Sequence, residues 1–104
     1  MSSAADKDLY AGLIRLHVLH HAAKEPLFGY WMVDELARHG YRLSTGTLYP
    51  ILHGLEAKGY LKSKLKRDGK TVRRFYSATP AGRRALKMAL NKVRELYGEL
   101  IEEK

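Results

Sequence analysis

The sequence predicts a mostly α-helical fold with a single β-hairpin, and three observations lead to this class. Apolar residues recur at helical spacing in three segments before residue 59. Two short runs then flank an Asp-Gly pair, which is among the strongest short signals for a hairpin. A last segment after Pro80 returns to helical spacing. We expect one compact unit, since 104 residues can enclose a modest core.

The first predicted helix covers about residues 6–23 and ends before Pro26, because the residue ahead of a proline is pushed away from helical geometry. Its apolar stripe is too wide for one neighbour, so we expect this helix to lie between two surfaces. The stripe consists of Leu9, Tyr10, Leu13, Ile14, Leu16, Val18, Leu19 and Ala23. The second predicted helix covers about residues 29–39 and stops at Gly40. Its apolar side carries Tyr30, Val33, Leu36 and Ala37.

A third helix is predicted over about residues 45–58, with Gly59 as its C-terminal cap. Pro50 constrains where this helix begins. In a helix interior a proline removes a hydrogen bond and costs about 3 kcal/mol, whereas in the first turn its missing N–H has no partner to lose. We therefore expect the regular helix to begin near Thr47, after a looser turn through Gly46. Its core positions are Leu48, Ile51, Leu52 and Leu55.

Two strands are predicted at about residues 61–66 and 71–77, joined by a turn at Asp68-Gly69. This turn sets the pairing of the strands. Leu65 then lies opposite Val72, and Leu61 lies opposite Tyr76. We expect these two apolar pairs to form the inner face of the hairpin.

The last predicted helix covers about residues 79–103, with Thr79 as its N-cap and Pro80 at the first helical position. Its apolar residues step alternately by four and three, which is the heptad spacing of a helix that packs along another helix. They are Leu86, Leu90, Val93, Tyr97 and Leu100. This spacing indicates a dimer in which two copies pair through their last helices.

Composition limits the classes of function. The formal net charge of +8 favours a polyanionic partner without separating DNA from RNA or an acidic membrane surface. The chain has no cysteine, so disulfides and thiolate metal sites are excluded. No apolar run resembles a signal peptide or a membrane span, and we expect a cytoplasmic protein that does not enter a membrane. No catalytic motif occurs, so we expect neither an enzyme nor a cofactor.

The order of three helices, a hairpin and a last helix is typical of a winged helix-turn-helix, in which the third helix enters the major groove of DNA. This interpretation makes residues 1–78 a DNA-binding domain and residues 79–104 a C-terminal dimerisation helix. The exposed side of the third helix carries Thr45, Thr47, Tyr49, Pro50 and His53. The alternative is that Ser44 and Thr47 only cap the helix and that Tyr49 is a core aromatic.

The predicted hairpin carries seven cations against one acid, Asp68. They are Lys62, Lys64, Lys66, Arg67, Lys70, Arg73 and Arg74. In the predicted pairing Lys64 lies across from Arg73, and like charges in that position destabilise a ribbon unless a phosphate backbone relieves them. The alternative is a solvated edge strand made basic to prevent aggregation.

A histidine group on the first helix is a weak metal candidate. His17 and His21 are four residues apart, so their imidazoles share a face, and His20 lies between them. No carboxylate or cysteine stands at a matching spacing, and ordinary helix histidines are therefore the favoured interpretation. Trp31 is expected to cover the core, with stacking on a planar ligand or an interface as alternatives.

Three segments of the chain resemble the PadR-like transcriptional regulators, a family of winged-helix proteins. Residues 26–30, PLFGY, lead to Glu35-Leu36, and residues 43–56 contain the diagnostic run LSTGTLYP followed by LH and LE. Residues 59–82 carry GYL, RRFY, Thr79 and Gly82, which are similar to the wing and exit of that family. The resemblance covers about residues 14–86.

The resemblance implies a homodimeric DNA-binding regulator, usually a repressor, of the small subgroup with a single C-terminal helix. It adds Ser44 to the DNA-contact candidates of the third helix. It also places Tyr10 and Ile14 of the first helix beside the last helix in the dimer interface. Some relatives bind hydrophobic or aromatic compounds near that interface and release DNA. The main alternative is a winged-helix module that binds an acidic protein surface and DNA only non-specifically.

Overall fold

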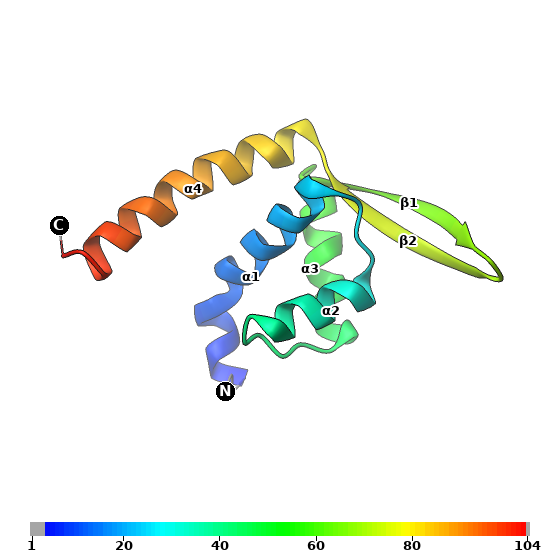
Figure 1. Ribbon diagram of the computed structural model, residues 1–104, viewed down its shortest axis with the longest axis horizontal. Helices are drawn as coiled ribbons and strands as arrows, with labels where there is room; N and C mark the ends of the chain where they lie inside the picture. The colour runs from blue at the N-terminus through cyan, green and yellow to red at the C-terminus, as the bar shows by residue number, and fades with distance from the viewer. Residues whose placement is uncertain (1–3, 104) are drawn as a thin grey trace.

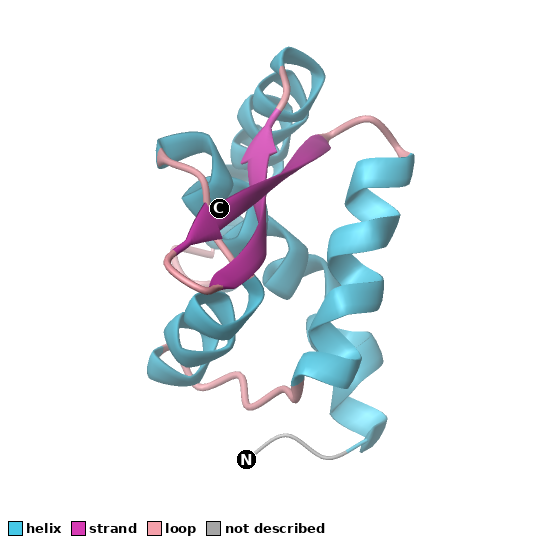
Figure 2. Ribbon diagram, turned by 90° about the vertical axis from the view of Figure 1, so that its right-hand side faces the viewer, coloured by secondary structure: helices cyan, strands magenta, loops and turns pink. Residues whose placement is uncertain are grey.

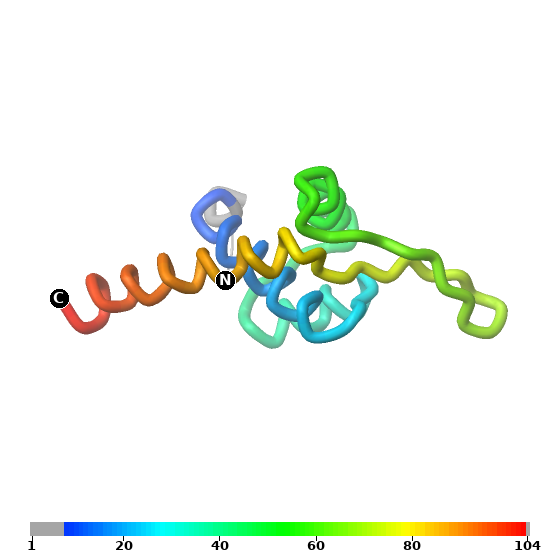
Figure 3. The backbone as a smooth tube through the Cα atoms, turned by 90° about the horizontal axis from the view of Figure 1, so that it is seen from above, coloured from blue at the N-terminus to red at the C-terminus, as the bar shows by residue number. Residues whose placement is uncertain are grey.

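The structure, a computed structural model, describes residues 4–103 and confirms the winged-helix class (Figure 1). The elements in chain order are α1 (Ala4–Lys24), α2 (Gly29–Arg38), α3 (Thr45–Ala57), β1 (Leu61–Asp68), β2 (Thr71–Ala78) and α4 (Pro80–Leu100). The hairpin and the far end of α4 point to opposite ends of a molecule 53 Å long (Figures 1 and 3). Residues 1–3 and 104 of the predicted domains lie outside the described range. None of the described helices combines the length and apolar content that a bilayer crossing requires.

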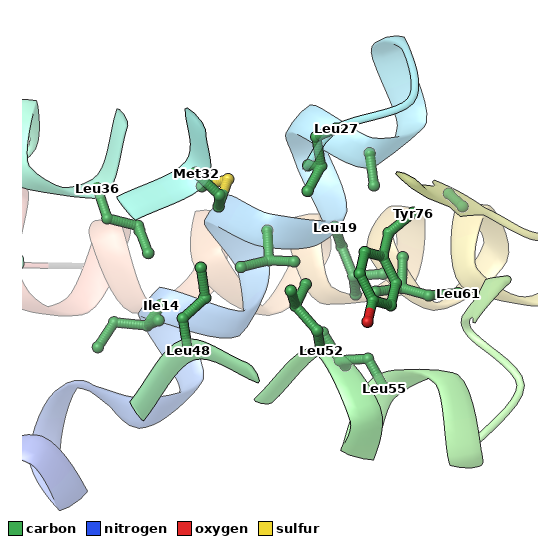
Figure 4. Close-up of a cluster of buried hydrophobic side chains, with 13 residues drawn as sticks. Ile14, Leu19, Leu27, Met32, Leu36, Leu48, Leu52, Leu55, Leu61 and Tyr76 are labelled. Carbon is green, nitrogen blue, oxygen red and sulfur yellow. The ribbon is translucent and has the colours of Figure 1, made fainter. Parts of the chain in front are cut away.

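The core lies where α1, α2, α3 and the base of the hairpin meet (Figure 4). It confirms all four core positions predicted on α3, of which Leu48, Leu52 and Leu55 are buried and Ile51 is half-buried. The buried side chains are Ile14, Val18, Leu19, Ala22, Leu27, Met32, Leu36, Leu48, Leu52, Leu55, Leu61, Tyr76 and Ala78.

Three residues on the predicted apolar sides of the first two helices are in fact exposed, namely Leu9, Leu13 and Tyr30. Leu9 of α1 is 72% exposed, because the stripe of that helix wraps beyond the core and faces α4 and solvent. Tyr30 of α2 is 70% exposed, whereas Met32 is fully buried. Two residues along a helix differ by about 200° around its axis, so the burial of Met32 and Leu36 turns Tyr30 outward.

The expectation that the third helix starts at Thr47 is wrong, because α3 is helical from Thr45 onward. Ser44 is its N-cap, with the side-chain oxygen accepting a hydrogen bond from the Thr47 N–H at 3.2 Å. Pro50 is therefore the sixth residue of the helix and lies inside it. It leaves the carbonyl of Gly46 without an intrahelical donor, and Gly46 is exposed, so water can hydrogen-bond there.

The predicted pairing of the hairpin is wrong by two residues. Asp68 pairs with Thr71, so the two-residue turn is Gly69-Lys70, and Gly69 has a φ of 65°. A positive φ at the first turn residue only is the pattern of a type II′ turn, which favours glycine there. A shift of two residues leaves each side chain on its predicted face, since faces alternate with period two.

Only the base of the hairpin reaches the core. Leu65, predicted on the inner face, is 57% exposed, and Val72 is also exposed. This part of the ribbon extends past the helices in Figure 1 and lies in front of them in Figure 2. Tyr76 is fully buried, and its backbone N–H and carbonyl pair with Leu27 at 2.8 and 2.9 Å. The short segment between α1 and α2 thus fixes the base of the hairpin. We call the whole hairpin, residues 61–78, the wing.

The entrance to α4 is a close contact between backbones. Thr79 caps the helix by accepting from the Gly82 N–H at 3.0 Å, and its hydroxyl donates to the Gly59 carbonyl. A Cβ at residue 82 would overlap the carbonyl oxygen of Tyr60. Only glycine at residue 82 therefore allows the first turn of α4 to lie this close to the backbone of Tyr60.

We predict that Gly82→Ala lowers the free energy of unfolding by about 1–3 kcal/mol, since the added methyl overpacks against backbone that cannot move aside cheaply. Gly54→Ala is the matched control, because a Cβ there has open space within 4 Å. It should raise stability by about 0.5–1 kcal/mol through helix propensity. Urea denaturation followed by circular dichroism measures both, and equal stabilisation by the two alanines would contradict the packing of α4.

Candidate nucleic-acid interface

The helix-turn-helix consists of α2, the turn at residues 39–44 and α3. Pro50 and His53 are exposed on α3, while Thr45, Thr47 and Tyr49 are half-buried. These side chains offer hydroxyls, an imidazole and apolar surface, which can contact phosphates, base edges or thymine methyls. The exposed face of α3 is thus polar at its beginning and lacks a long arginine, asparagine or glutamine side chain.

Ser44 performs the capping role that the sequence left as an alternative. Its Oγ accepts from the Thr47 N–H and also lies 3.3 Å from the Thr47 hydroxyl oxygen. Both side chains are therefore held at the start of α3. A phosphate that approached this end would meet hydroxyls already fixed in position.

The side chain of Tyr49 lies partly in the core and partly at the surface. Its hydroxyl lies against Gly29 at the start of α2, where a Cβ would stand 2.6 Å from that oxygen. Its ring centroid is 6.1 Å from that of His53, the next exposed side chain along this face of α3. Packing against α2 fixes the ring and leaves its outer edge beside His53.

Phe28 supports the basic face of the wing. The guanidinium carbon of Arg73 lies 4.6 Å from the centre of the Phe28 ring, and the Phe75 ring meets Phe28 edge-on at 5.5 Å. Lys66 in turn lies 5.7 Å from the centre of the Phe75 ring. Cation–π attraction orders the two cations without neutralising their charge. The sequence had no signal for this contact, since Phe28 is far from the wing in the chain.

The opposite face of the wing is joined to α3 through hydrogen bonds. Arg74 donates to the Ser63 hydroxyl oxygen at 3.0 Å, and Ser63 donates to a carboxylate oxygen of Glu56 at 2.7 Å. Glu56 lies on α3. The chain of bonds sets the base of the wing relative to α3, and neither Ser63 nor Glu56 was identified from the sequence.

A groove of about 380 Å³ connects the wing to the two helices. Its walls come from α2, α3 and β2, and it brings Tyr49 of α3 beside Arg73 and Arg74 of the wing. The lining residues are Phe28, Tyr30, Tyr49, Thr71, Val72, Arg73 and Arg74.

The positive charge of the wing lies mostly outside this groove. Lys62, Lys64 and Lys66 share the face of Arg73, Arg67 shares the face of Arg74, and Lys70 is at the tip. Lys64 lies opposite Phe75 and not opposite Arg73 as predicted, but Lys66 does lie opposite Arg73. The like-charge repulsion is therefore present in a different pair. The ion pairs of Glu35 with His21, Arg38 and His39 all lie outside the wing.

A group of polar side chains, separate from the wing, lies at the C-terminal end of α2. His17 and His21 of α1 meet His39, and Glu35 contacts His21 and His39 at 3.3 and 3.1 Å. Burial, followed by the neighbouring imidazoles, lowers the pKa of His17. Burial also lowers the pKa of His21, although Glu35 opposes it. The pKa of Glu35 is lowered chiefly by its hydrogen bond with His39.

Trp31 also packs beside α1. The sequence predicts that it covers the core, but its side chain is 37% exposed and lies edge-on to His21 at 5.3 Å. It borders a pocket of about 240 Å³ together with Phe28 and Phe75. Its position follows that of Tyr30, since both turn away from the buried face of α2.

An apolar groove of about 630 Å³ runs between α1 and α4. Its lining residues are Leu9, Tyr10, Gly12, Leu13, Leu16, Ala89, Lys92, Val93 and Leu96. Leu90, Val93, Tyr97 and Leu100 of the predicted heptad are exposed, and Leu86 is half-buried. Ile14, assigned to the dimer interface, instead lies in the core at 4% exposure. Leu9 and Leu13, which were not assigned to it, are exposed on the same helix.

Comparisons with known proteins agree with this architecture. The family model described as the transcriptional regulator PadR-like family matches residues 18–88. The transcriptional regulator Rv3488 of Mycobacterium tuberculosis is 47% identical over 95 residues, covering 91% of this chain and 89% of that protein.

Solved structures show the same fold. A PadR family transcriptional regulator from Eggerthella lenta matches with a TM-score of 0.78 at 33% identity, over 93% of this chain and 88% of that chain. A PadR-like transcription factor from Bacteroides fragilis matches with a TM-score of 0.80 over 98% of this chain and all of that chain. At 19% identity the second match supports the fold alone.

Proposed function

The chain belongs to the PadR-like family of transcriptional regulators, which implies DNA binding, and we propose that it is a homodimeric repressor of a palindromic operator. The observation that carries this proposal is the groove in which Tyr49 of α3 lies beside Arg73 and Arg74 of β2, with Lys66 paired opposite Arg73 in the wing. We assign α3 to the major groove and the wing to the adjacent phosphate backbone.

Phosphate contacts supply most of the affinity in this proposal. The α3 face has no arginine, asparagine or glutamine to make a bidentate contact with a base. The wing instead carries seven cations, two of them ordered on aromatic rings. Sequence preference then comes from Thr45, Tyr49, Pro50 and His53 and from the shape of the DNA.

A second copy of the chain is the proposed occupant of the exposed apolar surface of α1 and α4. Leu100 and Tyr97 are 65% and 54% exposed near the end of α4, where that helix projects from the body of the molecule (Figure 3). A two-fold pairing would bury this surface in both copies. It would also hold two α3 helices at a fixed spacing, about 34–36 Å for adjacent major grooves.

The proposed effector site is the α1–α4 groove, which is part of the apolar surface assigned to the dimer contact, so an effector there would compete with the second copy. Its lining is almost entirely apolar, with Lys92 as the charged member. A hydrophobic or aromatic compound that entered it would separate or reorient the helices that carry the dimer, and so release DNA.

We also propose that the protein is located in the cytoplasm. In this proposal residues 1–78 bind DNA, and residues 79–104 form the contact between the two copies of the dimer.

The alternative is a module that uses the basic wing to bind an acidic protein surface. Selection of bound sequences from a random DNA pool separates the two functions. A repressor enriches one palindromic sequence, whereas the alternative gives a ratio of specific to non-specific affinity near one. Footprinting of the upstream region of the protein's own gene then tests autoregulation.

We predict that Arg73→Ala and Arg74→Ala weaken binding to all DNA sequences and flatten the dependence of log affinity on log salt. The slope should fall by about 0.9 for each phosphate that is no longer neutralised, and in a dimer each substituted arginine leaves two such phosphates. Fluorescence anisotropy at several salt concentrations measures this.

Arg94→Ala is the charge-matched control, since Arg94 lies on the half of α4 that points away from the wing (Figure 1). Its slope should equal that of the unmodified protein. If Arg73→Ala and Arg74→Ala also kept the salt slope of the unmodified protein, the wing would not be part of the DNA interface.

We predict that Leu90→Asp converts the dimer into monomers and weakens operator binding by about 100-fold, because joining two half-site contacts adds about 10²–10⁴ in affinity. Met88→Asp is the control, since Met88 is 70% exposed and faces away from the heptad stripe. Light scattering after gel filtration gives the mass of both variants. A dimer with unchanged affinity in Leu90→Asp would rule out pairing through this face.

A further inference from the structure

Three imidazoles from two helices meet beside the helix-turn-helix. His17 and His21 are one turn apart on α1, and His39 directly follows α2. One ring nitrogen from each lies within 4.8 Å of the other two. The rings of His17 and His39 are 4.7 Å apart between centroids, and those of His21 and His39 are 6.5 Å apart.

A carboxylate completes the group. One oxygen of Glu35 is 3.3 Å from the Nε2 of His21 and 3.1 Å from the Nε2 of His39. The other oxygen accepts a hydrogen bond from Arg38 at 3.1 Å. The Glu35 side chain is 14% exposed, so it is held largely out of water among these partners.

The sequence alone pointed to ordinary helix histidines because no acidic partner stood at a suitable spacing on α1. The fold supplies that partner from α2, together with a third imidazole. Glu35 and His39 are four residues apart, so they share one face of that helix end. We call His17, His21, His39 and Glu35 the histidine cluster.

We propose that the histidine cluster binds one divalent transition-metal ion of the zinc type through three imidazole nitrogens and one carboxylate oxygen. Imidazole ligands favour zinc, nickel and copper, whereas magnesium and calcium prefer oxygen ligands. Ligand atoms around tetrahedral zinc are about 3.3 Å apart, given Zn–N distances of about 2.0–2.1 Å. The Glu35 oxygen already lies at about this distance from the Nε2 atoms of His21 and His39. The three imidazole nitrogens, which lie within 4.8 Å of one another, would close inward around the ion.

The position of the cluster gives the metal a structural consequence. It would join α1 to the end of α2, directly before the turn that leads to α3. His17 also borders a pocket of about 260 Å³ whose other side is formed by Leu86, Leu90 and Val93 of α4. A bound ion would thus make the contact between the helix-turn-helix and the paired helices α1 and α4 more rigid.

Isothermal titration of tag-free, chelator-treated protein with Zn²⁺ tests the site without any DNA. We expect one ion per chain, and we expect His17→Gln and His39→Gln each to weaken binding by more than about 100-fold, because loss of even an outer partner of a ligand costs about 10–100-fold. His20→Gln is the matched control on α1, and His53→Gln is the control on α3; both should bind as the unmodified protein does.

Thermal unfolding provides a second measurement that does not depend on the titration. Zinc should raise the melting temperature of the unmodified protein and of the two controls but not of the cluster variants, since binding to the folded state alone stabilises it. Melting in chelator reports whether each variant folds, and Glu35→Gln adds a variant that keeps all histidines. Absence of binding up to about 100 μM Zn²⁺, or an equal loss in His20→Gln and His39→Gln, would overturn the proposal.

Discussion

The arrangement of the molecule depends on how the base of the wing is buried. Tyr76 is fully buried with its ring directed toward the leucines of α3, while its backbone pairs with Leu27 (Figure 4). This single residue joins the wing to α3 and to the segment between α1 and α2. Because the strands leave the core immediately beyond it, their cations are presented to solvent at a fixed angle to α3. A hairpin that was not anchored in this way would be marginally stable at best.

Periodic features of the sequence predicted most of the fold, and non-periodic ones caused the errors in the hairpin turn and in the start of α3. The helices, the hairpin and the α3 core follow from spacing, and the faces of the strands are right despite a two-residue error in pairing because faces alternate with period two. Asp68-Gly69 suggested the wrong turn, since Gly69 supplies the positive φ from the first turn position. Pro50 suggested a late helix start through its missing hydrogen bond, whereas the Ser44 cap stabilises an earlier one.

The candidate sites depend on contacts that no spacing rule reveals. Phe28 lies under Arg73, and Glu56 reaches Arg74 through Ser63, although each pair is far apart in the chain. The basic character of the wing was visible from composition, but the ordering of its side chains was not. The same holds for His39 beside His17, since helical spacing reports neighbours on one helix and says nothing of the facing one.

Helix α1 is the element through which the separate surfaces can influence one another. One side of it packs in the core through Ile14 and Val18, a second side lines the groove with α4, and a third carries His17 and His21. A ligand in the groove and an ion in the histidine cluster would therefore both act on the position of one rigid helix. Coupling between them requires that each favour one of two arrangements of α1 relative to α2. Val18 is fully buried in the core, and close packing there resists a gradual shift, so a change at either surface would have to move α1 as a whole relative to α2.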